Sequence, residues 1–372
     1  MSYRQASTSQ VRVRSVRERK SKHQFDEIAT DTSAPLPDPG PLAEPAQRLA
    51  NAIRQARAAD ASVMLCYGAH LVKNGLGPLV AEMIRGGWIT HLATNGAGVI
   101  HDWEYAFQGR SEEDVRTNIA DGTFGAWDET GRYTLMANAV GALDSMGYGE
   151  SIGRLISAGG CNIPSVDQLQ QQLAAWAHAP DDSETAAAVA DLLGCIKAGE
   201  WAPGWHAIEH ERASVSLAAA AFDASVPLTV HPGIGYDIVY VHPQARASVL
   251  GRAAGIDFRV LCDSVDRLST AGVVLSVGSA VMAPQVFEKA SSVANNLRSQ
   301  RSQTPISPAI FVNDLQASTW DWTQGEPPAT DPAYYLRFLK SFSRISPKPL
   351  SYLSGDNRVV LRYLHHLLTS DD

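Results

Sequence analysis

"THLATNGAGVIHDWEYAF", residues 90–107, begins with the pattern of a buried strand and ends with that of a helix, and a turn with two glycines lies between them. The glycine spacing differs from the G-x-G-x-x-G of a dinucleotide-binding turn. His101 and Asp102 follow the turn directly. In parallel sheets, ligands bind where strands end and loops lead into helices. The stretch therefore predicts a ligand-facing turn and makes both side chains candidates for chemistry.

The same pattern of a buried strand followed by a helix recurs along the chain. Strand patterns stand at SVMLCYG (62–68), PLTVHPG (227–233), GVVLSVGSAV (272–281) and PAIFVNDL (308–315), and a helix pattern follows each of them. Alternation of strands and helices is typical of parallel sheets with helices on both faces. We therefore predict an α/β fold, a doubly wound, Rossmann-like and mostly parallel sheet flanked by helices.

The chain divides by composition into an arm and a body. Residues 1–46 are basic and then rich in proline, which predicts a disordered arm with an extended linker. The alternative is a segment that docks on a neighbouring subunit or at the mouth of the active site. Residues 47–372 are predicted to form a single α/β domain. A mainly helical insertion is expected at about residues 134–211.

Charge and hydropathy exclude several classes of partner. The 372-residue chain has a formal net charge of -8, so no general electrostatic attraction to nucleic acid is expected. Its apolar runs are far shorter than the ~20 residues of a membrane helix. The N-terminus is charged and no apolar stretch follows it, unlike a signal peptide. These features predict a cytoplasmic protein that binds neither nucleic acid nor membrane.

Small residues gather in the turns at the predicted strand ends. Four of five such turns, YGAHLVKNG, TNGAGVIHD, VHPGIGYD and SVGSAVMAP, are rich in glycine or alanine, whereas VNDLQASTWD is not. Glycine and alanine let the backbone approach a ligand and present N–H groups to phosphate. Four such turns in one chain favour a nucleotide site.

These turns, in this order, resemble those of the deoxyhypusine synthase family, and most closely its bacterial deoxyhypusine-synthase-like members. The likeness covers roughly residues 62–107 and 214–342. It implies an NAD-dependent transferase that moves an aminoalkyl group from an amine substrate through an imine on a lysine. It also implies a homotetramer with sites built at a dimer interface.

The resemblance implies a role for one lysine. Lys340 stands eight residues after Pro332, as the family's imine-forming lysine does. Helical periodicity would put Ala333 and Leu336 on its face, and an apolar wall would favour the nucleophilic free amine. The alternative is a lysine at the surface of an amphipathic helix.

The resemblance also assigns residues to the cofactor, NAD. They fall in the turns quoted above, and they are Gly68, Ala69, Lys73, Asn95, Gly96, Ala97, Gly278, Ser279, Asp314 and Leu315.

The residues that hold a polyamine in the family are mostly replaced. Ile100 and His101 stand where the family has two glutamates, and Pro232 replaces an aspartate, although Asp237 matches a second one. Without those carboxylates a polycation loses its charge-assisted hydrogen bonds, so authentic deoxyhypusine synthesis is not expected.

New polar residues suggest a different substrate. We predict His101 and Asp237 as catalytic, because a neutral imidazole can act as an acid or base near pH 7. His70, His231 and Asp102 are the predicted substrate-binding residues. Histidines from separate turns have no ligand-spacing signature, so no metal site is predicted.

Three functions remain open at this stage. The first is an NAD-dependent enzyme that acts on an amine-bearing small molecule through an imine. The second is the same fold used as a lyase or hydrolase with His101 and Asp102 as acid and base. The third is a non-catalytic tetrameric binding protein.

Overall fold

The computed structural model describes residues 3–178, 183–278 and 282–370. Its centre is a six-stranded sheet in the order β10-β9-β8-β2-β3-β7, in which every neighbouring pair is parallel. The strands are β2 (Val63–Tyr67), β3 (His91–Thr94), β7 (Leu228–Val230), β8 (Val273–Val277), β9 (Ala309–Asp314) and β10 (Ser351–Ser354). The predicted doubly wound α/β fold is confirmed.

The strand order creates a switch point in the sheet. From β2 the chain adds β3 and β7 on one side, then returns and adds β8, β9 and β10 on the other. Connections on either side of β2 and β8 therefore run in opposite directions. In open α/β sheets the crevice at such a point, outside the carboxyl ends of the strands, is where ligands bind.

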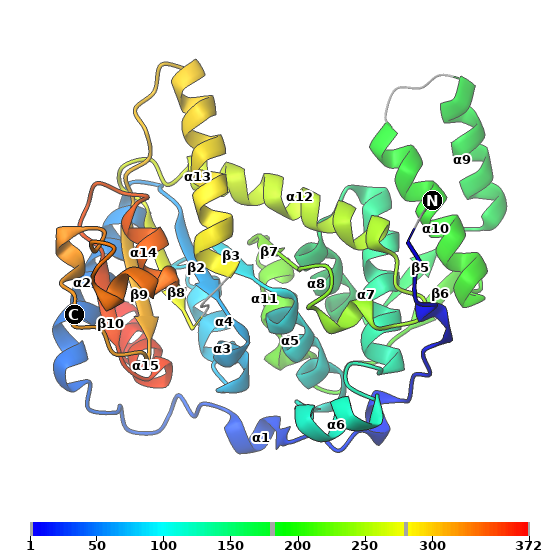
Figure 1. Ribbon diagram of the computed structural model, residues 1–372, viewed down its shortest axis with the longest axis horizontal. Coiled ribbons are helices and arrows are strands. Elements are labelled where there is room, and N and C mark those ends of the chain that lie inside the picture. Colours follow the sequence, from blue (N-terminus) through cyan, green and yellow to red (C-terminus); the bar gives the residue numbers. More distant parts are fainter. Residues whose placement is uncertain (1–2, 179–182, 279–281, 371–372) are drawn as a thin grey trace.

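Helices cover both faces of the sheet, as Figure 1 shows. Those from the N-terminal half are α1 (Phe25–Ile28), α2 (Ala43–Ala58), α3 (Ala69–Lys73), α4 (Gly77–Arg85), α5 (Gly96–Gln108), α6 (Val115–Asp121), α7 (Asp128–Gly141), α8 (Tyr148–Ala158) and α9 (Val166–His178). Those that follow are α10 (Ser183–Gly199), α11 (Leu217–Asp223), α12 (Ala247–Asp266), α13 (Met282–Gln300), α14 (Arg337–Ser343) and α15 (Asn357–Thr369).

Alternation along β2 divides the core in two. Val63, Leu65 and Tyr67 pack in one cluster with α2, α4, α5, α11 and α15, whereas Met64 and Cys66 pack in another with α12, α13 and α14. Successive strand side chains point to opposite faces, so a strand with helices on both faces is apolar at every position. This explains why the strand patterns read as continuous apolar runs.

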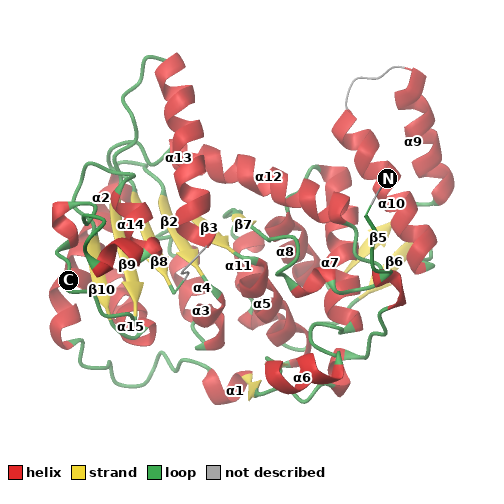
Figure 2. Ribbon diagram, in the orientation of Figure 1, coloured by secondary structure: helices red, strands yellow, loops and turns green. Residues whose placement is uncertain are grey.

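The region predicted as a helical insertion contains α8, α9 and α10 and most of α7. It also contains a small antiparallel pair, β5 (Gly160–Ile163) and β6 (Gly204–Ala207). Figure 2 shows this pair among helices, well apart from the six parallel strands. Since β5 and β6 are 40 residues apart in sequence, no local hairpin signal marks them.

The N-terminal segment differs from the disordered arm that the composition suggests. Residues 3–46 run along the body of the molecule (the blue trace at the lower edge of Figure 1). Val16, Arg19 and Phe25 are buried. Strand β1 (His23–Gln24) pairs with β4 (Arg110–Ser111). Tertiary contacts of these few side chains order an otherwise polar segment. We call residues 14–25 the strap.

The helix predicted around Lys340 needs correction. The helix expected around Lys340 is broken into a 3-10 turn (Pro332–Tyr335) and α14, because Leu336 leaves the helical region with ψ 73°. Ala333, Leu336 and Lys340 therefore do not share one continuous helix face.

Candidate functional site

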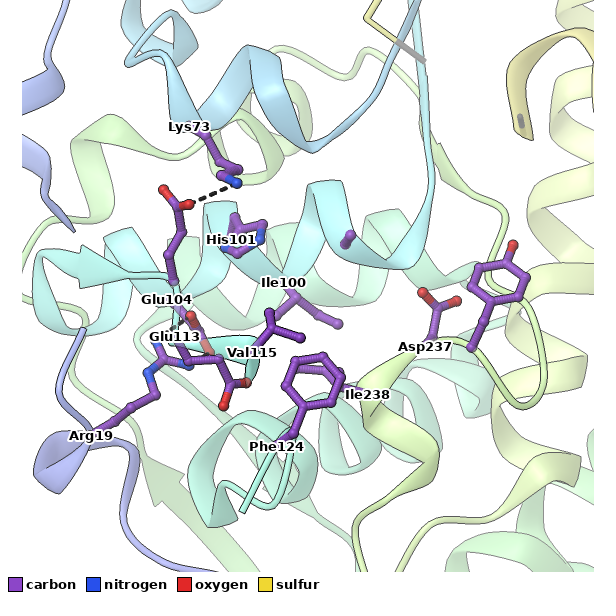
Figure 3. Close-up of a pocket in the computed structure, with 13 residues that line it drawn as sticks. Arg19, Lys73, Ile100, His101, Glu104, Glu113, Val115, Phe124, Asp237 and Ile238 are labelled. Atoms are coloured by element: carbon purple, nitrogen blue, oxygen red, sulfur yellow. Dashed lines mark hydrogen bonds and ion pairs between the residues drawn. The ribbon is translucent and has the colours of Figure 1, made fainter. Parts of the chain in front are cut away.

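A cavity of about 240 Å³ opens beside residues 90–107. It lies between the strap, α3, α5, α6 and the loop that ends at Asp237. Its lining residues are Arg19, Lys73, Ala97, Ile100, His101, Glu104, Glu112, Glu113, Val115, Phe124, Tyr236, Asp237 and Ile238. Figure 3 shows Arg19 at one end and Asp237 at the other, with the apolar side chains of Ile100, Val115, Phe124 and Ile238 between them.

A buried ion pair anchors the polar end of the cavity. Arg19 Nη1 and Nη2 donate to the two carboxylate oxygens of Glu104 over 2.9 and 2.6 Å. The two side chains are only 2% and 1% exposed. Thr130 Oγ1 also donates to Glu104, over 3.0 Å. Burial alone would raise the pKa of Glu104, but the charge and hydrogen bonds of Arg19 outweigh it and hold the pKa below its ordinary value. Glu104 is therefore an ionised, accept-only group at neutral pH.

His101 is tied to this carboxylate through Ser111. The Ser111 hydroxyl donates to Glu104, and His101 Nδ1 lies 2.7 Å from Ser111 Oγ. A serine hydroxyl has one proton, so we assign the donor role in the second contact to His101 Nδ1–H. Burial lowers the pKa of His101, and the charges of Lys73 and Arg19 lower it further against the opposing effect of Glu104 and Glu112. The ring is therefore neutral, and its Nε2 carries the free lone pair.

Lys73 and Glu112 form a second ion pair above His101. Lys73 Nζ lies 2.7 Å from Glu112 Oε2, the contact drawn as a dashed line at Lys73 in Figure 3. Tyr105 OH also reaches Glu112, over 3.4 Å. Glu112 adopts a left-handed backbone with φ 71°, which side chains other than glycine adopt at a cost. The surrounding contacts thus hold a strained residue in the cavity wall.

Asp237 closes the opposite end of the cavity. Its Oδ2 accepts a hydrogen bond from the Gly233 amide over 2.6 Å. Burial raises the pKa of Asp237 to about 6, and that single hydrogen bond only partly opposes the rise. A Cβ added to Gly96 would lie 2.5 Å from Asp237 Cγ, so glycine is required at this first residue of α5. Asp237 is therefore a buried carboxylate that changes charge just below neutral pH.

The switch point between β2 and β8 lies at the other end of α3 from the cavity. Gly68 follows β2 and Gly278 follows β8, and the amide of Gly68 donates to Val277 O over 3.2 Å. Gly278 has φ 55°, a conformation that favours glycine. His70 is exposed and lies beside Gly278. A Cβ added to Gly278 would lie 3.8 Å from His70 Cβ. The small α3 runs from this crevice to Lys73 in the cavity wall.

The other predicted cofactor residues lie along the same edge of the sheet. Asn95 caps α5 by accepting from the Gly98 amide, while Ala97 lines the cavity. Asp314 ends β9, and Leu315 beside it is 75% exposed. Ser279 lies outside the described residues. The predicted cofactor residues therefore fall into two neighbouring groups, one at the cavity and one beyond β8.

Small residues and one unpaired group at the switch point fit a dinucleotide. Gly68, Ala69 and Gly278 leave the backbone approachable there. Asn313 Oδ1, just before the end of β9, is buried and has no hydrogen-bond partner among the described residues. The acidic residue that usually follows the second strand of a dinucleotide fold is replaced by Asn95. The small residues therefore fit a pyrophosphate, and the unpaired Asn313 Oδ1, which can only accept, fits a hydroxyl or amide donor of the ligand.

Asp102 lies on the other side of α5, in the core rather than at a substrate site. Its carboxylate accepts from Ser216 Oγ at 2.6 Å and from the amides of Leu217 and Ala218 at 2.8 and 3.1 Å. These groups form the N-terminus of α11, whose first amides have no partner within the helix. Asp102 is thus a helix cap.

His231 and Lys340 also lie away from the cavity. His231 is buried, and its Nε2 contacts Thr229 Oγ1 at 3.1 Å. Burial lowers the pKa of His231 to about 4, which is typical of a neutral core histidine. Lys340 lines a separate hollow between α13 and α14, with its Nζ 3.5 Å from the centre of the Tyr334 ring. The structure does not bring either residue to His101.

Four residues of the site, Arg19, Glu104, Ser111 and Glu112, were not predicted from the sequence. Glu104 carried a weak signal, since it is a charged residue three positions after His101 on a mostly apolar helix. Arg19 carried none, because it is one of many cations in a polar segment. Its role depends on a contact between residues 85 positions apart.

Comparisons with known proteins identify no family. No protein-family model matches the chain, and no curated protein matches it in sequence. Three solved structures that superpose on it are AgrE in complex with ornithine and NAD+ (12% identity, TM-score 0.44, 90% of this chain and 34% of that chain), ArgZ, an arginine dihydrolase from the ornithine-ammonia cycle in cyanobacteria (13%, 0.39, 87% and 32%), and a conserved putative LOR/SDH protein from Methanococcus maripaludis S2 (13%, 0.39, 92% and 72%). The chain spans about a third of the length of AgrE and ArgZ.

At these identities and TM-scores the three structures carry no argument about ligand or reaction. None of them is a deoxyhypusine synthase, so that resemblance stays a hypothesis drawn from the motifs. Within the described residues, no helix is long and apolar enough to cross a membrane. The same residues contain no cluster of three or more metal-ligating side chains.

Proposed function

We propose that this protein is an NAD-dependent enzyme that oxidises an amine-bearing small molecule in the cavity beside α5. The observation that carries the proposal is the position of α3. This five-residue helix joins the switch-point turn at Gly68 to the cavity that His101 lines. Five residues of helix span about 7 Å, so the crevice and the cavity are close enough to form one continuous site.

The charges of the cavity favour a cationic substrate. Four carboxylates line it against two cationic side chains. Glu104, Glu112 and Glu113 are engaged by protein donors, whereas Asp237 accepts one backbone hydrogen bond and remains available to a ligand. An ammonium group would pair with Asp237, and the apolar wall of Ile100, Phe124 and Ile238 would contact the carbon chain.

His101 would act as the base. Its Nε2 would take a proton from the substrate nitrogen, and the lone pair left behind would form the carbon–nitrogen double bond as hydride leaves the neighbouring carbon. NAD supplies the acceptor for that hydride when it is bound. Glu104, through Ser111, would stabilise the imidazolium that forms on the ring.

The role of Lys340 as an imine-forming lysine comes only from the resemblance to the deoxyhypusine synthase family. An imine on Lys340 would make the enzyme a transferase. Because Lys340 lies in another hollow, the oxidation proposed for the cavity does not use it.

The experiment is a cofactor titration with two variants at Ala69. The protein should bind NAD in a calorimetric titration, and Ala69→Asn should bind it similarly. Ala69→Asp should weaken binding at least about tenfold, because a carboxylate near the pyrophosphate adds like-charge repulsion. Aspartate in the first turn of a helix does not harm folding. If neither NAD nor NADP binds at millimolar concentration, the cofactor assignment is wrong.

One observation favours a second candidate. The series of hydrogen bonds from Arg19 through Glu104 and Ser111 to His101 is complete without a nucleotide. A lyase or hydrolase that uses His101 as its base would need only this. Turnover of an amine without NAD, lost in His101→Asn, would favour this candidate.

A further inference from the structure

We infer that the strap is part of the active site and that Arg19 is a positioning residue that keeps His101 Nε2 free of a proton. This inference rests on the proposed function, because it concerns the same cavity. It goes beyond that proposal by assigning a role to a segment whose sequence predicts disorder.

The strap holds two parts of the site at once. It carries Arg19 to Glu104, and its strand β1 pairs with β4, which carries Ser111. The Lys22 amide donates to Glu112 O over 3.0 Å, and the Phe25 amide donates to Gly109 O over 2.8 Å. The strap backbone therefore positions the segment that contains Ser111 and Glu112.

Further contacts fasten the strap to the body. Arg14 exchanges backbone hydrogen bonds with Ala126 and Asp128, over 3.0 and 2.8 Å. Ser15 Oγ and the Val16 amide both donate to the Glu129 carboxylate, over 2.6 Å each. Contacts on both sides of Arg19 thus place its guanidinium without relying on the ion pair.

Arg19 sets the charge balance of the buried network. The charged groups that face His101 are Glu104 on α5, Lys73 on α3, Glu112 after β4 and Arg19 on the strap. Lys73 and Glu112 balance each other as a pair, and Arg19 balances Glu104. Without Arg19 one buried negative charge is left over, and a buried unpaired charge is neutralised by taking up a proton.

Either of two routes leaves His101 Nε2 protonated. If the ring takes the proton, His101 becomes an imidazolium with both nitrogens protonated. If Glu104 takes it, Ser111 no longer donates to a carboxylate and turns to donate to Nδ1, which moves the ring proton to Nε2. In both cases the base of the proposed reaction is lost.

The test is ¹⁵N NMR of the His101 ring in the full-length protein, without substrate or cofactor. The wild-type protein should show an unprotonated, pyridine-like Nε2 at pH 7. Arg19→Gln should show a protonated, pyrrole-like Nε2. Arg17→Gln is the matched control, because Arg17 lies two residues away on the same strap and pairs with Glu211 at the surface. Its spectrum should equal that of the wild type.

Two outcomes would overturn the inference: a protonated Nε2 in the wild type, or an unprotonated Nε2 in Arg19→Gln. If Arg19→Gln does not fold, Arg19→Lys provides the second measurement, with Arg17→Lys as its control. One ammonium balances Glu104 less completely than a bidentate guanidinium, so the pKa of His101 should be higher than in the wild type. Titration curves identical to the wild type would contradict the role of Arg19.

The result is independent of the cofactor. Failure to bind NAD would remove the proposed oxidation and leave the NMR prediction intact. An unchanged His101 ring in Arg19→Gln would remove the role of the strap and leave NAD binding untouched.

Discussion

The two sides of α5 differ although their key residues are neighbours in sequence. His101 lines the cavity, and its Nδ1 bonds to Ser111, while no described residue hydrogen-bonds to its Nε2. Asp102 faces the core, where three donors at the N-terminus of α11 use its carboxylate. Successive residues on a helix point about 100° apart, so adjacent polar residues readily serve different purposes. His101 and Asp102 therefore do not form a catalytic dyad. One residue is available for chemistry, and the other holds two helices together.

Replacing His101 or Asp102 by asparagine, one at a time, tests this difference most strongly. His101→Asn keeps a donor to Ser111 but removes the base. Turnover of the amine substrate should fall about a hundredfold to ten-thousandfold, the usual contribution of a general base. The free energy of unfolding in urea should change by less than about 1 kcal/mol. A variant that unfolds more easily but turns over normally would reverse the assignment.

Asp102→Asn should have the opposite profile. The new amide cannot accept from all three donors of α11, so at least one buried donor is left unpaired. We expect a loss of about 2 kcal/mol in the free energy of unfolding. Turnover per folded molecule should stay close to the wild type. A large loss of activity in fully folded Asp102→Asn would show that both sides of α5 take part in the reaction.

The variant Asp237→Asn tests the role of the carboxylate at the far end of the cavity, because its effect on stability depends on pH. Folding raises the pKa of Asp237 from its ordinary 3.8 to about 6, so the folded protein holds this proton more tightly than the unfolded chain. The carboxyl costs no stability below its ordinary pKa. The cost grows as the pH rises toward 6 and is then constant, on the order of 2 kcal/mol.

Asp237→Asn should consequently be more stable than the wild type at pH 7, and the difference should vanish at low pH. Ionised Asp237 is also what attracts an ammonium group, so the affinity of the wild type for an amine should rise as the pH passes about 6. The variant should lack that rise. Denaturation curves and amine binding measured across this range check both statements, and equal stability at pH 7 would refute the first.

Lys340→Ala should have the smallest effect. Lys340 lies in the hollow between α13 and α14, so oxidation in the cavity should proceed unchanged when its amine is removed. Borohydride added during turnover gives the contrary test. Substrate carbon trapped on Lys340 would show that the two regions act together and would support the imine predicted from the family resemblance.

The sequence predicted the cavity partly, and the reasons differ from residue to residue. His101 and Asp237 were found because they stand in turns at the ends of recognisable strands. Ser111 and Glu112 follow α5 in a short segment without periodicity, so nothing local marked them. Arg19 could not be found at all, because its partner Glu104 is 85 residues away.

The fold shows the same division between local and distant information. Continuous apolar strands followed by helices establish a doubly wound sheet, because each pattern is satisfied by neighbours only a few residues away. The order of the strands, and with it the switch point between β2 and β8, depends on pairings between residues more than 200 positions apart, such as Val63 with Val273. Likewise, a polar N-terminal segment reads as disordered by composition. Only the folded body supplies the carboxylate of Glu104, the strand β4 and the cavity that turn it into a strap. Local periodicity is written in the sequence, whereas charge balance and strand order arise from contacts that exist only after folding.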